Sequence, residues 1–462
     1  MTGLSETAGT SGSALTYPEA LAFLESALAF GVHPSLDGIR ALTAGLDSPQ
    51  DAFAAVQVTG TNGKTSVTRA TAALLTAHGE RTGVYTSPHL VDYTERMAID
   101  GVPVSRDAFA SAIAAVLAVA DECMVQQALT LGLDVAMLDE AFTEFELLTA
   151  AALWLFARER CSWACLEVGM GGRWDSTSVV APRVAVVTGV GLDHTQRLGS
   201  TREAIATDKS HIIKPGSVAV MGPGCGGVEG IILKRAEAVG APVVRVAPRD
   251  AGVTWTVREK PSAPGGITRL DVSGRYATYP ALEIAAPSYQ APNIACALAA
   301  AEVALGHELQ PDAARAVLRE LRFPGRFELL GEHPPLVIDG AHNPQAARVL
   351  ADAIGEAFGD RRPAIVLSIL ADKDAAGIVA ELARVASMFV ITRNSSPRAR
   401  ECDELAALVA EMTGVTPLVV PEPGLAVQRA RELSDAGVVV TGSLYTAGQV
   451  RHWWETRGPE RF

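Results

Sequence analysis

From Ala54 onward, short apolar runs alternate with segments of helical periodicity. The run AAVQV is followed by a glycine-containing turn and then by KTSVTRATAALLTAHG, a helical pattern that ends at Gly79. Further apolar strands are predicted at residues 83–86, 163–168, 183–190 and 217–222, with helical patterns between most of them. Continuously apolar strands separated by helices are typical of a parallel sheet that is covered on both faces.

The pattern changes twice further along the chain. Between about residues 252 and 280, short alternating strands predict a small antiparallel appendage. After a helix of small residues at 293–305, Pro324 and Gly325 indicate a hinge, and strand–helix alternation then restarts. The second set of strands is predicted at residues 335–340, 364–370, 388–393 and 437–443.

These patterns predict an α/β fold with two domains. The N-terminal domain would span residues 15–321 and contain a mainly parallel sheet with the antiparallel appendage. A hinge at 322–325 would join it to a Rossmann-like α/β domain at 326–462, which is a normal domain size. Residues 1–14 are expected to form a disordered leader.

The composition argues against several classes of function and location. With 39 basic and 52 acidic side chains the formal net charge is −13, which argues against a main role in gripping nucleic acid or an anionic membrane. The six cysteines form no Cys-x-x-Cys pair and indicate buried thiols in a reducing compartment. The apolar-rich stretch at 108–120 is shorter than the roughly 20 residues that cross a bilayer. We therefore expect a cytoplasmic, monomeric protein with no nucleic-acid or membrane partner.

The segment VTGTNGKTS, residues 58–66, lies between the first predicted strand and its helix. It ends in the Gly-Lys-Thr of a phosphate-binding loop, although Val58 occupies the position of the usual first glycine. Such a loop needs inward-pointing N–H groups at a helix N-terminus, a lysine that reaches the β- and γ-phosphates, and a hydroxyl for magnesium. Gly60, Gly63, Lys64, Thr65 and Ser66 supply these groups. The alternative is an ordinary strand-to-helix turn with a surface lysine.

The run GTNGKTS resembles the nucleotide loop of ATP-dependent ligases that join an amino acid to a carboxylate, a superfamily that contains the Mur ligases and the folylpolyglutamate synthases. Six further stretches resemble folylpolyglutamate synthase motifs in the same order. They are YTSPHL (85–90), EVGMGGRWDST (167–177), GLDHTQRLG (191–199), TDKSHIIKPG with Lys209, PGRFE (324–328) and DGAHNP (339–344). The resemblance implies a P-loop ATPase-like N-terminal domain, a C-terminal glutamate-ligase domain and bifunctional dihydrofolate synthase/folylpolyglutamate synthase activity.

The resemblance also implies a magnesium site. Glu167 closes an apolar strand, so its carboxylate is expected to point into the ligand crevice of an open α/β sheet. The resemblance adds Ser87, His194 and Lys209 and suggests two magnesium ions. From the residues alone, His194 could equally be a general base or a turn histidine, since magnesium prefers oxygen ligands.

Lys209 lies in a predicted helix with Ser200 and Glu203 as its capping box. By resemblance Lys209 is carbamylated and acts in catalysis with Lys64 and His194, although the usual Glu-Lys pair is Asp208-Lys209 here. An ordinary solvated helix lysine is the alternative.

The resemblance assigns the nucleotide and substrate contacts residue by residue. ATP would be held by Gly60, Thr61, Asn62, Gly63, Lys64, Thr65, Ser66, Asn293, Arg326, Asp339 and His342. Arg326 and Asp339 would face it only after the domains close. The pterin end of dihydropteroate or a reduced folate would lie against Thr143, Phe145, Glu146, Trp174, Asp175 and Ser176. Phe145 and Trp174 could stack on a flat heterocycle, or could be core packing.

An acyl-phosphate route would then attach L-glutamate, since amide formation requires an activated carboxylate. Three alternatives remain open at this point. One is a monofunctional folylpolyglutamate synthase, and another is a Mur-type peptidoglycan ligase, for whose extra domain the roughly 45 residues before the loop are too few. The third is a nucleotide-binding module that performs no ligation.

Overall fold

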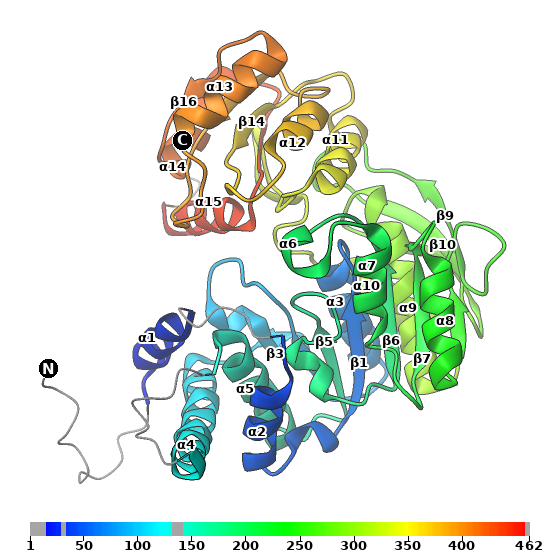
Figure 1. Ribbon diagram of the computed structural model, residues 1–462. Coiled ribbons are helices and arrows are strands. Elements are labelled where there is room, and N and C mark those ends of the chain that lie inside the picture. The colour runs from blue at the N-terminus through cyan, green and yellow to red at the C-terminus, as the bar shows by residue number, and fades with distance from the viewer. Residues whose placement is uncertain (1–14, 29–33, 132–141, 458–462) are drawn as a thin grey trace, which may run out of the picture.

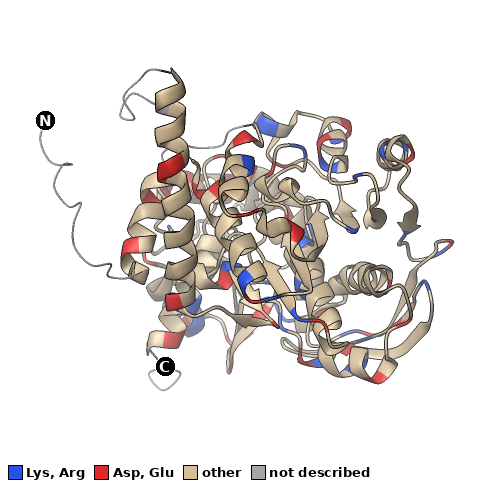
Figure 2. Cartoon of the chain, turned by 90° about the horizontal axis from the view of Figure 1, so that it is seen from below, with Lys and Arg blue, Asp and Glu red and all other residues tan. Residues whose placement is uncertain are grey.

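The computed structural model describes residues 15–28, 34–131 and 142–457, so the expected leader at 1–14 lies outside the described residues. Figure 1 shows two α/β domains, with the C-terminal domain placed over one end of the larger N-terminal domain. Basic and acidic residues are interspersed along most of the chain in the view of Figure 2.

An eight-stranded sheet organises the described part of the N-terminal domain, in the order β4-β3-β2-β5-β1-β6-β7-β8. Its parallel strands are β1 (Ala54–Thr59), β2 (Thr82–Tyr85), β5 (Trp163–Glu167), β6 (Val184–Gly189), β7 (Val218–Gly224) and β8 (Val243–Arg245). The antiparallel edge consists of β3 (Met97–Ile99) and β4 (Val102–Pro103). The sequence pattern predicted the parallel strands except β8 and did not predict the edge hairpin.

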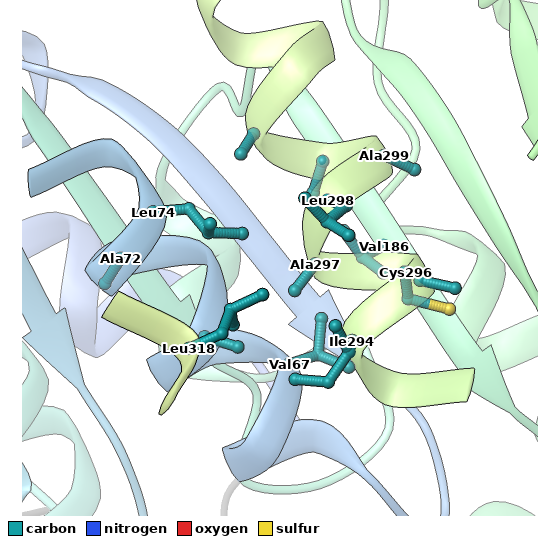
Figure 3. Close-up of a cluster of buried hydrophobic side chains, with 14 of the residues drawn as sticks. Val67, Ala72, Leu74, Val186, Ile294, Cys296, Ala297, Leu298, Ala299 and Leu318 are labelled. Carbon is teal, nitrogen blue, oxygen red and sulfur yellow. The ribbon is translucent and has the colours of Figure 1, made fainter. Parts of the chain in front are cut away.

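Both faces of this sheet are covered by helices, because successive side chains of a strand point to opposite faces. On one face, Val56 and Val58 of β1 pack with α3 (Lys64–Ala77), α9 (Ala291–Leu305) and α10 (Pro311–Glu320). Figure 3 shows Val67 of α3 beside Ile294 of α9, and Leu74 of α3 pointing toward α9 near Ala297 and Leu298, in this core. The other face is covered by α1 (Tyr17–Ala27), α2 (Asp37–Gly45), α4 (Arg106–Leu131), α5 (Glu144–Arg158), α7 (Arg202–Ser210) and α8 (Glu229–Val239).

The predicted antiparallel appendage is a three-stranded sheet of β9 (Thr254–Glu259), β10 (Thr268–Ser273) and β11 (Thr278–Ile284). Glu302 of α9 holds it to the domain: this buried carboxylate accepts hydrogen bonds from the Arg275 N–H at 2.6 Å and the Tyr279 hydroxyl at 2.7 Å. A buried charge is tolerated here because its oxygens have donors.

The described C-terminal domain contains a six-stranded sheet in the order β12-β13-β17-β14-β15-β16. Its strands are β12 (Glu328–Glu332), β13 (Pro335–Ile338), β14 (Ala364–Leu367), β15 (Met388–Ile391), β16 (Leu418–Val419) and β17 (Val438–Thr441), all parallel to their neighbours except β12. One face packs on α11 (Pro344–Phe358), α12 (Ala375–Leu382) and α13 (Cys402–Thr413), and the other on α14 (Pro423–Leu433) and α15 (Leu444–Arg457). The α/β fold with two such domains is the predicted one.

Helix α4 corrects the expectation about apolar stretches. Among the described residues, one segment, Arg106–Gln127 of α4, is long and apolar enough by length and composition to cross a membrane. In the structure 33% of its most apolar window is buried, and α4 packs against α1, α2 and α5. Length and composition alone are weak evidence for a membrane span, because core helices of other proteins pass the same test.

Candidate active site

A cavity of about 420 Å³ lies where the carboxyl ends of the two sheets meet, within the range typical of small-molecule sites. The N-terminal domain lines it with the phosphate loop, Glu167 and His194, and the C-terminal domain with Arg326 and Asp339. The two sheets therefore face one shared cavity.

The phosphate loop explains why no glycine is needed at position 58. Val58 is a fully buried strand residue, and β1 continues to Thr59, so the turn starts only at Gly60. A Cβ at Gly60 would lie 1.9 Å from the Thr188 hydroxyl oxygen, which only glycine avoids. Gly63 is the N-cap residue that precedes α3, and its φ of +84° is a left-handed conformation that also favours glycine.

The remaining loop residues are tied down around this turn. Thr61 exchanges hydrogen bonds with the backbone of Gly191, and Asn62 donates to Gln345 of the C-terminal domain at 3.2 Å. Ser66 is buried at the start of α3, where the helix N-terminus favours an anion.

Glu167 is a buried carboxylate at the end of β5, as predicted. It accepts hydrogen bonds from the Thr65 hydroxyl at 2.8 Å and from the Ser87 N–H at 3.2 Å. Burial raises the pKa of Glu167, while the charge of Lys64 opposes this shift. Thr65 and Ser87 therefore aim this carboxylate at the cavity.

Lys209 lies beside Lys64, and no carboxylate of the described residues is in hydrogen-bond contact with it. Its ammonium donates to the Gly60 carbonyl at 3.1 Å, and the Lys64 ammonium donates to the same oxygen at 3.2 Å. Burial, and then the positive charge of Lys64, lower the pKa of Lys209 to about 7. The lysine is 4% exposed, which contradicts the solvated alternative.

Two glycines bring α7 close enough for Lys209 to reach the loop. A Cβ at Gly171 would lie 2.2 Å from Asp208 Oδ1, and a Cβ at Gly172 would lie 2.9 Å from the Lys209 carbonyl. The predicted cap of this helix was wrong: Thr201, not Ser200, is the N-cap, and its hydroxyl accepts from the Ala204 N–H at 3.2 Å. The helix starts one residue later than the capping-box pattern suggested.

His194 occupies a left-handed turn (φ 51°) that begins the short helix α6 (Thr195–Leu198). Its N–H donates to Asp193 Oδ1 at 2.9 Å. The His194 side chain is 45% exposed; partial desolvation, together with nearby ammonium groups such as Lys373, lowers its pKa to about 4 against the opposing charge of Asp193, so the ring is neutral at pH 7. A neutral ring can accept a proton or bind a metal. Among the described residues, no group of three or more His, Cys, Asp or Glu side chains gathers that could hold a metal alone.

Arg326 and Asp339 enter the cavity from the C-terminal domain. Asp339 is buried, accepts from the N–H groups of Phe327 and Ala341 at 2.8 Å each, and has a pKa that burial raises. A Cβ at Gly340 would lie 2.6 Å from Arg326 Nη1, so this glycine gives the guanidinium room. These two residues already share the cavity with Lys64 in this domain arrangement.

Two other predicted nucleotide residues line the same cavity. Asn293 packs against Gly63 at the start of α9, and its amide donates to Gln290 at 2.7 Å. His342 follows β13, and its Nδ1 lies 2.9 Å from the Gly340 carbonyl oxygen.

Several predicted substrate residues also have structural partners. Thr143 and Glu146 form a capping box at the start of α5. Asp175 is buried, accepts from the Thr177 and Met170 N–H groups at 3.0 Å each, and has a pKa that burial raises. These three side chains therefore shape the local backbone.

The two predicted aromatic contacts, Phe145 and Trp174, differ in exposure. The ring centroids of Phe145 and Tyr85 are 5.9 Å apart, and Phe145 lies over Gly169, which lines the cavity. Trp174 is 42% exposed with Arg173 over its ring, and the neighbouring Ser176 is buried. Trp174 thus has more free surface for a ligand than Phe145.

Sequence reasoning missed several cavity residues. Lys373 follows β14 and binds Asp193 with Nζ–Oδ1 at 2.8 Å, and Tyr289, Gln345, Arg398 and Ser443 also line the cavity. Lys373 had one usable signal, since it comes just after a predicted parallel strand, at the edge where ligands bind. Asp193 lay within the GLDHT stretch but was not singled out.

Known proteins with similar sequences and structures are ATP-dependent ligases of one family. The family model described as "Mur ligase, glutamate ligase domain" matches residues 325–444. The dihydrofolate synthase/folylpolyglutamate synthase of Mycobacterium tuberculosis is 36% identical over 453 residues, covering 91% of this chain and 90% of that protein. The structure of E. coli FolC in complex with DHPP and ADP is 29% identical with a TM-score of 0.84, covering 97% of this chain and 100% of that one.

A third similar structure is described with a bound metal. The bifunctional folylpolyglutamate synthase/dihydrofolate synthase described with Mn, AMPPNP and L-glutamate bound is 28% identical with a TM-score of 0.80, covering 95% of this chain and 99% of that one. The identity and coverage of these relatives, together with the shared cavity of two α/β domains, show that this chain belongs to the dihydrofolate synthase/folylpolyglutamate synthase family of ATP-dependent ligases.

Proposed function

We propose that the protein is bifunctional: it adds L-glutamate to dihydropteroate, giving dihydrofolate, and to the terminal glutamate of reduced folates. The observation that carries this proposal is the cavity in which Lys64 and Glu167 of the N-terminal domain meet Arg326 of the domain that matches the glutamate-ligase family, with Lys209 hydrogen-bonded to the Gly60 carbonyl of the adjoining loop. Relatives described with DHPP, ADP, AMPPNP and L-glutamate support the same set of ligands.

The chemistry follows from these charges. A substrate carboxylate oxygen attacks the γ-phosphorus of ATP, a carboxyl–phosphate bond forms, and the bond to ADP breaks. The glutamate amine then attacks the acyl carbon, phosphate leaves, and the amine loses a proton. Lys64 and Arg326 stabilise negative charge on the transferring phosphoryl group because they are fixed before it arrives.

Magnesium fits the donors on the N-terminal side of the cavity. Glu167 offers a buried carboxylate, and Lys209 offers a buried amine with a lowered pKa that can react with carbon dioxide to give a carbamate. We propose that these residues, with Ser87 and neutral His194, hold two magnesium ions. When bound, the ions would neutralise phosphate charge.

The pterin end is proposed to lie near Phe145, Trp174 and Asp175, reached from the nucleotide cavity past Gly169. Because Asp175 also fixes the 170–177 backbone, its substitution is expected to harm both reactions, with the larger effect on dihydropteroate. The narrower alternative is a folylpolyglutamate synthase that does not use dihydropteroate.

The deciding experiment incubates the pure protein with ATP, magnesium and L-glutamate against dihydropteroate and tetrahydrofolate separately, and identifies products by mass. Both should be extended, and each should inhibit extension of the other if one pocket serves both. Extension of tetrahydrofolate without conversion of dihydropteroate would reduce the activity to folate polyglutamylation. A Mur-type activity would require ligation to a UDP-sugar substrate in the same assay.

The domain organisation belongs to this proposal as well. We assign the ATP-binding domain to residues 15–321, the hinge to 322–325 and the glutamate-ligase domain to 326–462. The six free cysteines and the net charge of −13 support a monomer that acts in the cytoplasm without nucleic-acid or membrane partners. Gel filtration with light scattering would test the oligomeric state.

A further inference from the structure

An ion pair joins the two domains inside the cavity. Lys373 lies in the C-terminal domain between β14 and α12, and Asp193 follows β6 in the N-terminal domain. Lys373 Nζ and Asp193 Oδ1 are 2.8 Å apart, and the two side chains are only 11% and 10% exposed.

The Asp193 carboxylate links this pair to other parts of the site. Its Oδ1, which binds Lys373, also accepts the backbone N–H of His194 at 2.9 Å. Its Oδ2 faces two residues of the C-terminal domain, with Asn343 Nδ2 at 3.5 Å and His342 Nε2 at 3.6 Å. The Asp193 carboxylate thus contacts three residues of the C-terminal domain and the backbone of His194.

We propose that the Asp193–Lys373 pair is a latch that holds the two domains in the arrangement that forms the cavity, and that Lys373 is a positioning residue for ligation. Through Asp193 the latch also fixes the turn of His194, so docking of the C-terminal domain and the geometry of the N-terminal site are set together. The effect on ligation rests on the proposed function, whereas the effect on domain arrangement does not.

Because the Asp193–Lys373 pair is buried, breaking it costs more free energy than breaking an exposed pair. Removing one partner of a buried ion pair leaves an uncompensated charge in a low-dielectric site, whereas exposed pairs contribute little. The chain contains a matched comparison: Lys260 binds Glu356 of α11 at 2.7 Å and also joins the two domains, but Lys260 is 60% exposed and lies outside the cavity lining. Glu356 also keeps Ser288 as a donor when Lys260 is removed.

A competing role for Lys373 is direct binding of the nucleotide, in which case its ion pair with Asp193 does not hold the domains together. The two explanations differ for Asp193→Asn, which removes the charge of the acceptor and leaves Lys373 in place. A direct ligand would still be available in that variant, whereas a latch would be broken.

The test combines small-angle X-ray scattering of the ligand-free protein with calorimetric ADP binding for Asp193→Asn, Lys373→Met, the double variant and the control Lys260→Met. We expect each single latch variant to raise the radius of gyration and to weaken ADP binding by about 10-fold, because only the docked fraction binds with full affinity. The double variant should be no worse than either single variant, since both remove one interaction. Lys260→Met should match the wild type.

Three results would overturn the latch: unchanged scattering in both single variants, ADP effects that multiply in the double variant, or weakened ADP binding in Lys373→Met with normal binding in Asp193→Asn. Circular dichroism checks folding, and Lys373→Gln replaces Lys373→Met if the latter does not fold. A wild-type protein that bound no ADP would contradict the proposed function, and scattering would still decide the latch.

Discussion

At the scale of single residues, Lys64 and Lys209 are two cations for which the described residues supply no carboxylate in hydrogen-bond contact. Lys64 and Lys209 both donate to the Gly60 carbonyl oxygen, so two ammonium groups share one neutral acceptor. Like charges this close disfavour each other's charged form, and an arriving anion removes that cost. The arrangement therefore suits the Lys64 ammonium to binding phosphate and favours loss of a proton from the Lys209 ammonium.

The first prediction concerns Lys64. Lys64→Ala should lower the rate of ligation by about 100-fold or more, since a cation that stabilises phosphoryl charge is lost. The melting temperature should change little, because within the described residues the Lys64 ammonium hydrogen-bonds only to the carbonyls of Gly60 and Thr61. Lys234→Ala, an exposed lysine on α8, is the matched control. Near-normal ligation by Lys64→Ala would contradict the phosphate-loop assignment.

The second prediction concerns carbamylation of Lys209. With a pKa of about 7, the amine becomes neutral as the pH rises through 7, and only the neutral amine reacts with carbon dioxide. Wild-type activity should therefore fall in CO₂-depleted buffer and recover with bicarbonate, more completely at pH 8 than at pH 6. The folded pKa lies below that of a free lysine, so this group also makes stability rise with pH above about 7.

The matching variant is Lys209→Ala, which should be nearly inactive and regain part of its rate with acetate. A crystal with ATP and magnesium should show density for a carbamate at the lysine tip. An unmodified amine pointing to solvent in such a crystal would exclude carbamylation.

At the scale of secondary-structure elements, apolar runs predicted the strands that are buried on both faces. The apolar pattern did not predict strands that are exposed or only half-buried, because their side chains need not be apolar. Strand β4 is exposed, and β12, which follows the predicted hinge by three residues and is only half-buried, was not predicted as a strand. Helix α4 extends past the expected end of its apolar stretch to Leu131, because its later turns carry polar residues that a search for apolar runs does not count.

The third prediction tests the corrected cap of α7. Thr201→Ala should destabilise the protein by about 1 kcal/mol because the Ala204 N–H loses its acceptor, and it should also lower activity because α7 carries Lys209. Ser200→Ala is the matched control, since the capping-box pattern would assign the effect to Ser200. Urea unfolding of both variants measures the difference. A larger loss in Ser200→Ala than in Thr201→Ala would restore the original assignment.

At the scale of the whole molecule, the candidate site was only partly predictable. Local motifs indicated the phosphate loop, Glu167 and Asp339, since each lies beside the strand that positions it. The Asp193–Lys373 pair was not predictable, because the two residues are 180 positions apart and meet only through the packing of two domains. The local hydrogen bonds of Thr143, Glu146 and Asp175 were not predicted either, because these residues were considered only as substrate contacts, a role that stays a prediction.

The final prediction depends on both domains. Arg326 lies directly after the hinge, lines the cavity with Lys64, and hydrogen-bonds only the Gly325 carbonyl among the described residues, at 3.0 Å. Its guanidinium is therefore free to bind phosphate, and Arg326→Ala should lower kcat by about 100-fold while costing only about 1 kcal/mol of stability. Arg322→Ala, four residues earlier and exposed, removes the same charge outside the cavity and should leave kcat unchanged. Steady-state kinetics and thermal melts of the two variants make the comparison. Equal kcat values for Arg326→Ala and Arg322→Ala would remove Arg326 from the site and leave the C-terminal domain without a direct part in phosphoryl transfer at this position.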